Sequence, residues 1–278
     1  MSRGRTRYLI GAICLAICAV MLAPLVATVA ASFKSTEEAG TTPPTYFPHG
    51  LTMDSYDRLW SYQLGLPAYL TNSLGTALLA ILITLALTLP AGYGLARFPV
   101  PGKEVIFVIL LLALIVPYQA LLTPMFLMFA KLKLTNTLLG LAILHTVIQL
   151  PFSLYILRNS FAAVPRELEE AAIVDGASSF QVLWRVFVPA SMPAVVTVAL
   201  FAFITSWNEF LGALVMMSRG SRFTLPLVLA SARTETSLGG TDWGMLQAGI
   251  TISVIPCVLV YLLLQRYYES GLMSGAVK

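Results

Sequence analysis

The stretch VPRELEEAAIVDGASSFQVLWRVFVPASMP, residues 164–193, decides the reading of this chain. Pro165 suits the first turn of a helix, where a missing N–H costs nothing, and the glutamates that follow favour the positive end of the helix dipole. Asp175-Gly176 then predicts a turn. Residues 180–188 have apolar side chains at three- and four-residue spacing, which indicates a second amphipathic helix. We therefore expect two short helices joined by a sharp turn.

The rest of the chain is far more apolar than this stretch. Of its 278 residues, 58% are hydrophobic and only 11% are charged, whereas soluble domains average roughly 25% charged residues. A soluble protein of this size needs more charge to cover its surface, and intrinsic disorder requires low hydrophobicity. We therefore expect an all-α membrane protein, with residues 1–278 forming a single transmembrane domain.

Apolar stretches long enough to cross a bilayer, which takes about 20 residues, occur six times. The first is too long for the apolar core of a signal peptide, so we expect an uncleaved anchor. The loop between the fourth and fifth stretches, residues 158–192, contains the two short helices. The six expected transmembrane helices cover approximately residues 8–31, 69–97, 105–129, 138–157, 193–217 and 246–267.

Lysine and arginine residues set the expected orientation in the membrane. Arg3, Arg5 and Arg7 precede the first span, and positive charge beside a span favours the cytoplasmic side. With six spans, both termini and the loop 158–192 are then cytoplasmic. The net charge of +4 is explained by such flanking residues, and no basic run with interleaved aromatics occurs, so we expect no nucleic-acid partner.

The loop 158–192 has two alternative partners, the lipid surface and another protein. An amphipathic helix lying on lipid is one reading, but three glutamates in its first helix disfavour an anionic bilayer. Ala171 and Ala172 permit close approach by another protein surface. Gly176 permits a chain reversal that a side chain would hinder. These residues favour a docking helix joined to the transmembrane bundle without slack.

At these residues the chain resembles a known family. Glu170-Ala171-Ala172 is followed after three residues by Gly176, and after nine more by the run VFVP at 186–189. This pattern resembles the EAA loop of permease subunits of bacterial ABC importers, with valine in place of isoleucine and of leucine. Residues 91–98 (AGYGLARF), 207–211 (WNEFL) and 271–278 (GLMSGAVK) are similar to maltose-type carbohydrate permeases.

The resemblance covers nearly the whole chain and implies a fold, a location and partners. The implied fold is that of type I ABC importer permeases, in the bacterial inner membrane, with the EAA loop as a cytoplasmic coupling helix. The implied partners are a second, homologous permease subunit, two ABC ATPase subunits and an extracytoplasmic solute-binding protein. The residues expected to couple to the ATPase are Glu169, Glu170, Ala171, Ala172, Asp175 and Gly176.

The chain itself has no sign of nucleotide binding or catalysis. It contains no G-x-x-x-x-G-K-[ST] sequence to cradle phosphates, so ATP and Mg are expected on the partner ATPase subunits and no cofactor on this chain. We find no nucleophile–base pair and propose no catalytic residue. His49 and His145 lack metal-ligand company, so we expect structural histidines and no metal site.

Polar residues in the expected spans are candidates for the solute pathway. Glu209 is the only carboxylate well inside a span, where an acidic residue costs roughly 2.5–3.5 kcal/mol, so we expect it to face a cavity or a partner. With Trp207 and Asn208 it offers an aromatic face, an amide and a carboxylate, which suit a sugar. A structural polar contact explains Glu209 equally well. Asn72 and Gln119 are weaker candidates, which helix packing also explains.

We therefore expect the permease subunit of an ATP-driven importer of a sugar or sugar derivative. An ABC permease for a non-sugar solute is one alternative; the spans contain no cluster of cationic side chains to receive a phosphate ester. An ion-coupled secondary transporter is another, but inverted repeats and intramembrane ion sites are not visible. A membrane enzyme lacks a catalytic constellation here.

Overall fold

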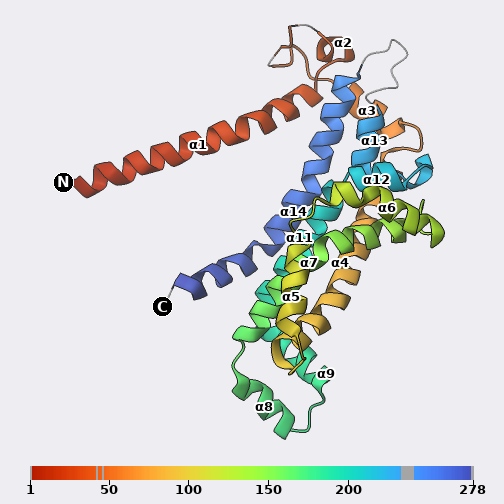
Figure 1. The fold of residues 1–278 in the computed structure, drawn as a ribbon. Coiled ribbons are helices and arrows are strands. Elements are labelled where there is room, and N and C mark those ends of the chain that lie inside the picture. Colours follow the sequence, from red (N-terminus) through yellow and green to blue (C-terminus); the bar gives the residue numbers. More distant parts are fainter. Residues whose placement is uncertain (1, 42, 46, 233–240, 277–278) are drawn as a thin grey trace. The chain divides into compact units, whose positions relative to one another are not determined.

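The computed structural model describes residues 2–41, 43–45, 47–232 and 241–276, and every secondary-structure element in them is a helix (Figure 1). The internal contacts divide the chain into two compact units. The first unit combines Met1–Pro67 with Val228–Pro256, and the second combines Ala68–Leu227 with Cys257–Lys278. The single domain expected from the sequence remains a prediction.

The first unit contains the N-terminal helix α1 (Ser2–Ser32) and the first part of α14 (Trp243–Ala276). Apolar side chains of α1 such as Leu15 and Val20 are exposed, which is the surface a helix presents to lipid. Two short helices, α2 (Thr36–Ala39) and α3 (Asp54–Ser61), follow α1.

Polar contacts hold the segment between α1 and α3 in place. Lys34 Nζ donates a hydrogen bond to the carbonyl oxygen of Thr45. The carboxylate of Glu38 accepts hydrogen bonds from Thr45 Oγ1 at 2.9 Å and from the backbone N–H of His49 at 3.2 Å. Arg58 on α3 pairs with Asp242, with 3.1 Å between Nε and Oδ2. The segment is therefore folded on itself rather than extended.

The second unit is built around α7 (Leu138–Ala163), which packs along α11 (Met192–Asn208). Both helices are apolar on nearly every side, and one face of each is buried in the unit. The other helices that begin in this unit are α5 (Lys103–Leu112), α6 (Tyr118–Lys131), α8 (Arg166–Val174), α9 (Ser179–Val182), the π-helix η1 (Leu183–Phe187), α10 (Val188–Ala190), α12 (Leu211–Met216), the 3₁₀-helix η2 (Gly220–Arg222) and α13 (Leu225–Ser231).

Most of α4 (Leu66–Arg97) also belongs to the second unit. Figure 1 shows α8 and α9 at one end of this unit, where α4 ends and α5 begins. Phe161 near the end of α7 and Phe187 in η1 are fully buried in the core cluster at this end, together with Tyr93 of α4. The expected loop is therefore packed against helix ends, not suspended between them.

Four described helices are long and apolar enough to cross a membrane, namely α1, α4, α7 and α14. A fifth candidate is the pair Ser179–Ala190 and Met192–Asn208, which is bent by 84°. Within the described residues, the six spans expected from the sequence are therefore not confirmed. They remain a prediction.

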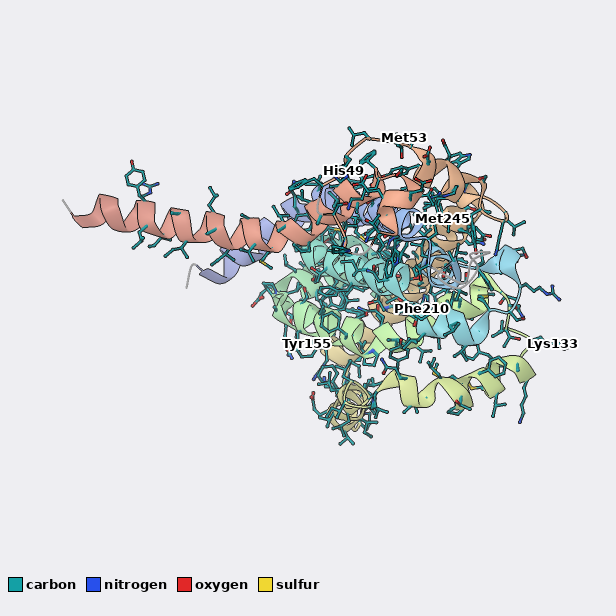
Figure 2. All side chains as sticks on the ribbon, turned by 90° about the horizontal axis from the view of Figure 1, so that it is seen from above. His49, Met53, Lys133, Tyr155, Phe210 and Met245 are labelled. Carbon is teal, nitrogen blue, oxygen red and sulfur yellow. The ribbon has the colours of Figure 1, made fainter. Side chains whose placement is uncertain are left out.

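Two expected spans are interrupted in the structure. The third, 105–129, is divided into α5 and α6 by a turn at residues 113–117, because Pro117 has no N–H to continue the helix. The fifth, 193–217, is divided where α11 ends at Asn208 and α12 begins at Leu211. Phe210, which is labelled in Figure 2, lies at this second break.

Candidate functional site

The loop 158–192 contains the two helical segments and the turn that the sequence predicts. Helix α8 ends at Val174, and the chain reverses through Gly176, whose φ of +84° is the left-handed conformation that glycine adopts without strain. A capping box then starts α9, because Ser178 and Gln181 exchange side-chain to backbone hydrogen bonds. The second segment is not one α-helix but α9, η1 and α10 in succession.

One side of α8 faces away from the rest of the unit. Four of the expected coupling residues, Glu170, Ala171, Asp175 and Gly176, are exposed. Beside them Val174 is 86% exposed and Ile173 55%. Exposed apolar side chains rimmed by carboxylates, on a rigid helix outside the expected spans, form a surface suited to a protein partner.

The other two expected coupling residues face the bundle. Ala172 packs against the core cluster at the end of α4 and α7. Glu169 is half-buried, and its Oε1 accepts a hydrogen bond of 2.9 Å from the hydroxyl of Tyr93. Nothing in the sequence pattern distinguishes Glu169 from Glu170, but successive helical residues point about 100° apart, so the two carboxylates have different surroundings.

Glu209 lies at the break between α11 and α12 and is 8% exposed. Its Oε1 accepts hydrogen bonds from the backbone N–H of Gly212 at 2.7 Å and from the hydroxyl of Tyr118 at 2.8 Å. Its Oε2 accepts one from the N–H of Ala213 at 3.1 Å. The carboxylate therefore caps the first turn of α12, whose N–H groups have no partner within the helix.

His145 of α7 completes this polar group. Its Nε2 lies 3.3 Å from Glu209 Oε2, and its Nδ1 lies 2.8 Å from Ser206 Oγ. The sequence interpretation of His145 as a structural histidine agrees with these contacts. No group of three or more His, Cys, Asp or Glu side chains among the described residues is placed to hold a metal ion.

The residues beside Glu209 have contrasting positions. Trp207 is buried and stacks on Phe203, with 5.6 Å between ring centroids. Asn208 is exposed, and its side-chain amide donates to the carbonyl oxygen of Ile204 at 2.9 Å. The three expected pathway residues of this segment thus do not share one surface. The sequence interpretation did not identify Tyr118 as a partner of Glu209. Tyr118 stands between Pro117 and the predicted pathway residue Gln119, and this position was the one available signal.

Asn72 and Gln119 also differ in their surroundings. The amide of Asn72 is buried and donates to the carbonyl oxygens of Ser221 and Phe223, each at 3.0 Å. Gln119 is exposed on α6. Asn72 therefore fixes the segment before α13 to α4, which is the packing role that the sequence left open.

Replacing Asn72 with alanine is expected to destabilise the chain by about 1–3 kcal/mol, because it removes two hydrogen bonds, each worth about 0.5–1.5 kcal/mol. Thermal unfolding of the detergent-solubilised protein measures this. Thr71→Ala is the matched control, since Thr71 is exposed and its hydroxyl bonds to Ala68 within the same helix. An Asn72→Ala protein that unfolds together with the control would contradict a packing role.

Long apolar helices, with a short exposed helical loop between two of them, define a multi-pass membrane protein. The chain belongs to the family of binding-protein-dependent transport system inner membrane components, whose family model matches residues 88–274. This range includes both the α8 loop and the group around Glu209. The family accounts for the expected location in the inner membrane.

Individual relatives and a solved structure agree with this assignment. The probable ABC transporter permease protein YurM of Bacillus subtilis is 33% identical over 259 residues, 92% of this chain and 83% of that protein. The diacetylchitobiose uptake system permease protein DasC of Streptomyces coelicolor is 32% identical over 255 residues, 90% and 89% of the two chains. The fold matches a chain from a bacterial ABC transporter involved in the import of the acidic polysaccharide alginate, with a TM-score of 0.82, 23% identity, and 96% and 98% of the two chains covered. The type I ABC importer permease fold expected from the sequence is confirmed.

Proposed function

We propose that this chain is the permease subunit of an ATP-driven importer that moves a sugar or sugar derivative across the bacterial inner membrane. The observation that carries the proposal is the family match over 88–274, which includes an exposed helical loop with the EAA pattern. The sugar class is supported by DasC, which is named for diacetylchitobiose uptake, and by the alginate importer.

In this proposal the exposed side of α8 docks on a partner ATPase. Glu170, Ala171, Asp175 and Gly176 form the contact surface, and Glu169 and Ala172 join that surface to the bundle. Two ATPase subunits bind ATP and Mg and hydrolyse ATP, whereas this chain is not catalytic. Closure of the ATPase pair draws the loops together and turns the bundle from inward- to outward-facing, and hydrolysis resets it.

The proposal includes six spans, with both termini and the α8 loop in the cytoplasm. A second, homologous permease completes the pathway, and an extracytoplasmic binding protein delivers the solute. Of the expected pathway residues, Asn208 and Gln119 are exposed and accessible to a solute or to the second permease. The other three, Trp207, Glu209 and Asn72, are buried and contact other residues of this chain. In this proposal they support the helices that line the pathway and do not touch the solute.

Uptake of labelled solutes by cells with and without the gene tests the proposal. We expect gene-dependent uptake of a mono- or oligosaccharide that stops with vanadate and continues when the proton and sodium gradients are collapsed. Uptake that ignores vanadate but needs an ion gradient would instead support a secondary transporter. Gene-dependent uptake of non-sugar solutes alone would support the other ABC alternative.

A further inference from the structure

Tyr93, near the end of α4, connects this helix to both halves of the α8 loop. Its hydroxyl donates to Glu169 of α8 at 2.9 Å. Its ring contacts Phe187 of η1, with 4.8 Å between centroids. Tyr93 itself is 5% exposed, so both contacts are made inside the protein.

Arg97, one turn further along α4, makes a second set of contacts with the same segments. One of its terminal nitrogens donates to the carbonyl oxygen of Phe161 at 2.9 Å and also to that of Val164. Its Nε lies 3.6 Å from Glu169 Oε2, and its guanidinium lies 4.8 Å from the ring centroid of Phe187. A single side chain thus joins the end of α7, α8 and η1 to α4.

The pair of Arg97 and Glu169 is largely withdrawn from water, with side chains 7% and 16% exposed. Two charges in such surroundings are stable only when they remain paired and hydrogen-bonded, and loss of one partner is strongly destabilising. The contacts therefore resist sliding of the loop over the end of α4. Glu170, the neighbour of Glu169, is exposed and free of this constraint.

We propose that Tyr93 and Arg97 are positioning residues that clamp the α8 loop to α4 through Glu169 and Phe187, so that loop and helix move as one body. The inference rests on the proposed function, since it concerns how force on the docking surface reaches the bundle. A pull on the exposed side of α8 is transmitted through the Glu169 carboxylate to the end of α4. The adjacent glutamates then have separate tasks, Glu170 toward the ATPase and Glu169 toward the bundle.

Spin-label distances in the complete transporter test this clamp. The chain, with Cys14, Cys18 and Cys257 replaced, carries labels at Glu167→Cys on α8 and Leu82→Cys on α4, both exposed positions. It is assembled in nanodiscs with the permease and ATPase subunits that co-purify with it. Without nucleotide and with MgATP plus vanadate, we expect the same narrow distance distribution, because the two labelled segments move together.

Arg97→Met is expected to broaden that distribution about twofold or more and to shift it between the two nucleotide states, since the end of α7, α8 and η1 lose the guanidinium that contacts all three. Arg97→Lys keeps the charge and should restore part of the narrow distribution. The matched control is Arg158→Met, because Arg158 also pairs with a glutamate, Glu104, and lies over an aromatic ring, that of Phe107. Among the described residues, neither its ion pair nor its ring contact involves α8. It should leave the distribution narrow.

Tyr93→Phe and Glu169→Gln keep the test decisive if Arg97→Met fails to fold. Tyr93→Phe removes the hydroxyl that bonds to Glu169 and keeps the ring, and Glu169→Gln removes the charge that pairs with Arg97. Each should broaden the distance distribution. Narrow distributions in all these variants, with ATPase bound and hydrolysing MgATP, would overturn the clamp alone. A wild-type complex that retains no ATPase subunit would overturn the proposed function, and the clamp with it.

Discussion

Gly176→Asp is expected to lower uptake about tenfold or more while the chain still inserts into the membrane. Gly176 has a φ of +84°, a conformation that costs residues with a side chain roughly 1–2 kcal/mol, and aspartate less than most of them. The new carboxylate also adds charge beside Asp175 on the proposed docking surface, where it would be desolvated on contact with the ATPase. Each 1.4 kcal/mol lost from docking is about tenfold in affinity. Vanadate-sensitive uptake at matched expression measures the effect.

Gly102→Asp is the matched control for this change. Gly102 has a φ of +72°, and at both glycines an added Cβ meets no atom within 4 Å. The two substitutions therefore introduce the same charge and the same backbone strain, but Gly102 lies before α5 and outside the docking surface. Gly176→Asn separates strain from charge, because asparagine has nearly the shape of aspartate and a similar tolerance of the left-handed conformation, but no charge.

Normal uptake by the Gly176→Asp transporter at normal expression would refute the coupling role of this turn. An equal loss from Gly102→Asp would show that general misfolding, not docking, is the cause. Equal losses from Gly176→Asp and Gly176→Asn would assign the effect to the backbone instead of the charge. Co-purification of the ATPase subunits distinguishes failed docking from failed transmission.

The local course of the α8 loop could be predicted because its signals lie within a few residues of what they specify. Pro165 precedes the first residue of α8, and the Asp175-Gly176 pair stands where the chain reverses. Proline geometry and glycine's access to positive φ need no distant partner. Which side of α8 is buried does depend on a distant partner, because Glu169 bonds to Tyr93, which lies 76 residues earlier in the chain. Local sequence signals therefore could not predict it.

The interrupted spans show where hydropathy alone is insufficient. Residues 105–129 are predominantly apolar, so composition predicts one helix. Of the two prolines in this range, Pro117 stands at the break between α5 and α6, whereas Pro124 lies inside α6. At the second break the signal was Glu209 itself, since a carboxylate can cap N–H groups a few residues ahead. The sequence interpretation compared a solute-pathway role for Glu209 with a structural polar contact, and did not consider that Glu209 could cap the start of α12.

Glu209→Ala is expected to cause the largest loss of stability among these variants, about 3 kcal/mol or more. Alanine would leave the N–H groups of Gly212 and Ala213, the Tyr118 hydroxyl and His145 without their shared acceptor in a buried site. In a membrane no water replaces that acceptor. The midpoint of thermal unfolding in detergent measures the loss, and Glu209→Gln, which keeps one acceptor oxygen, should lie between wild type and alanine.

Asn208→Ala is the matched control, because Asn208 adjoins Glu209 but is exposed, and its side-chain bond among the described residues is to Ile204 of the same helix. Its stability should change by no more than about 0.5 kcal/mol. Comparing the two variants separates the alternatives for this segment. If Glu209 binds solute, alanine there lowers uptake at unchanged stability. If it caps α12, stability falls and uptake falls only in proportion to the amount of folded protein, so that uptake per folded molecule is unchanged by Glu209→Ala.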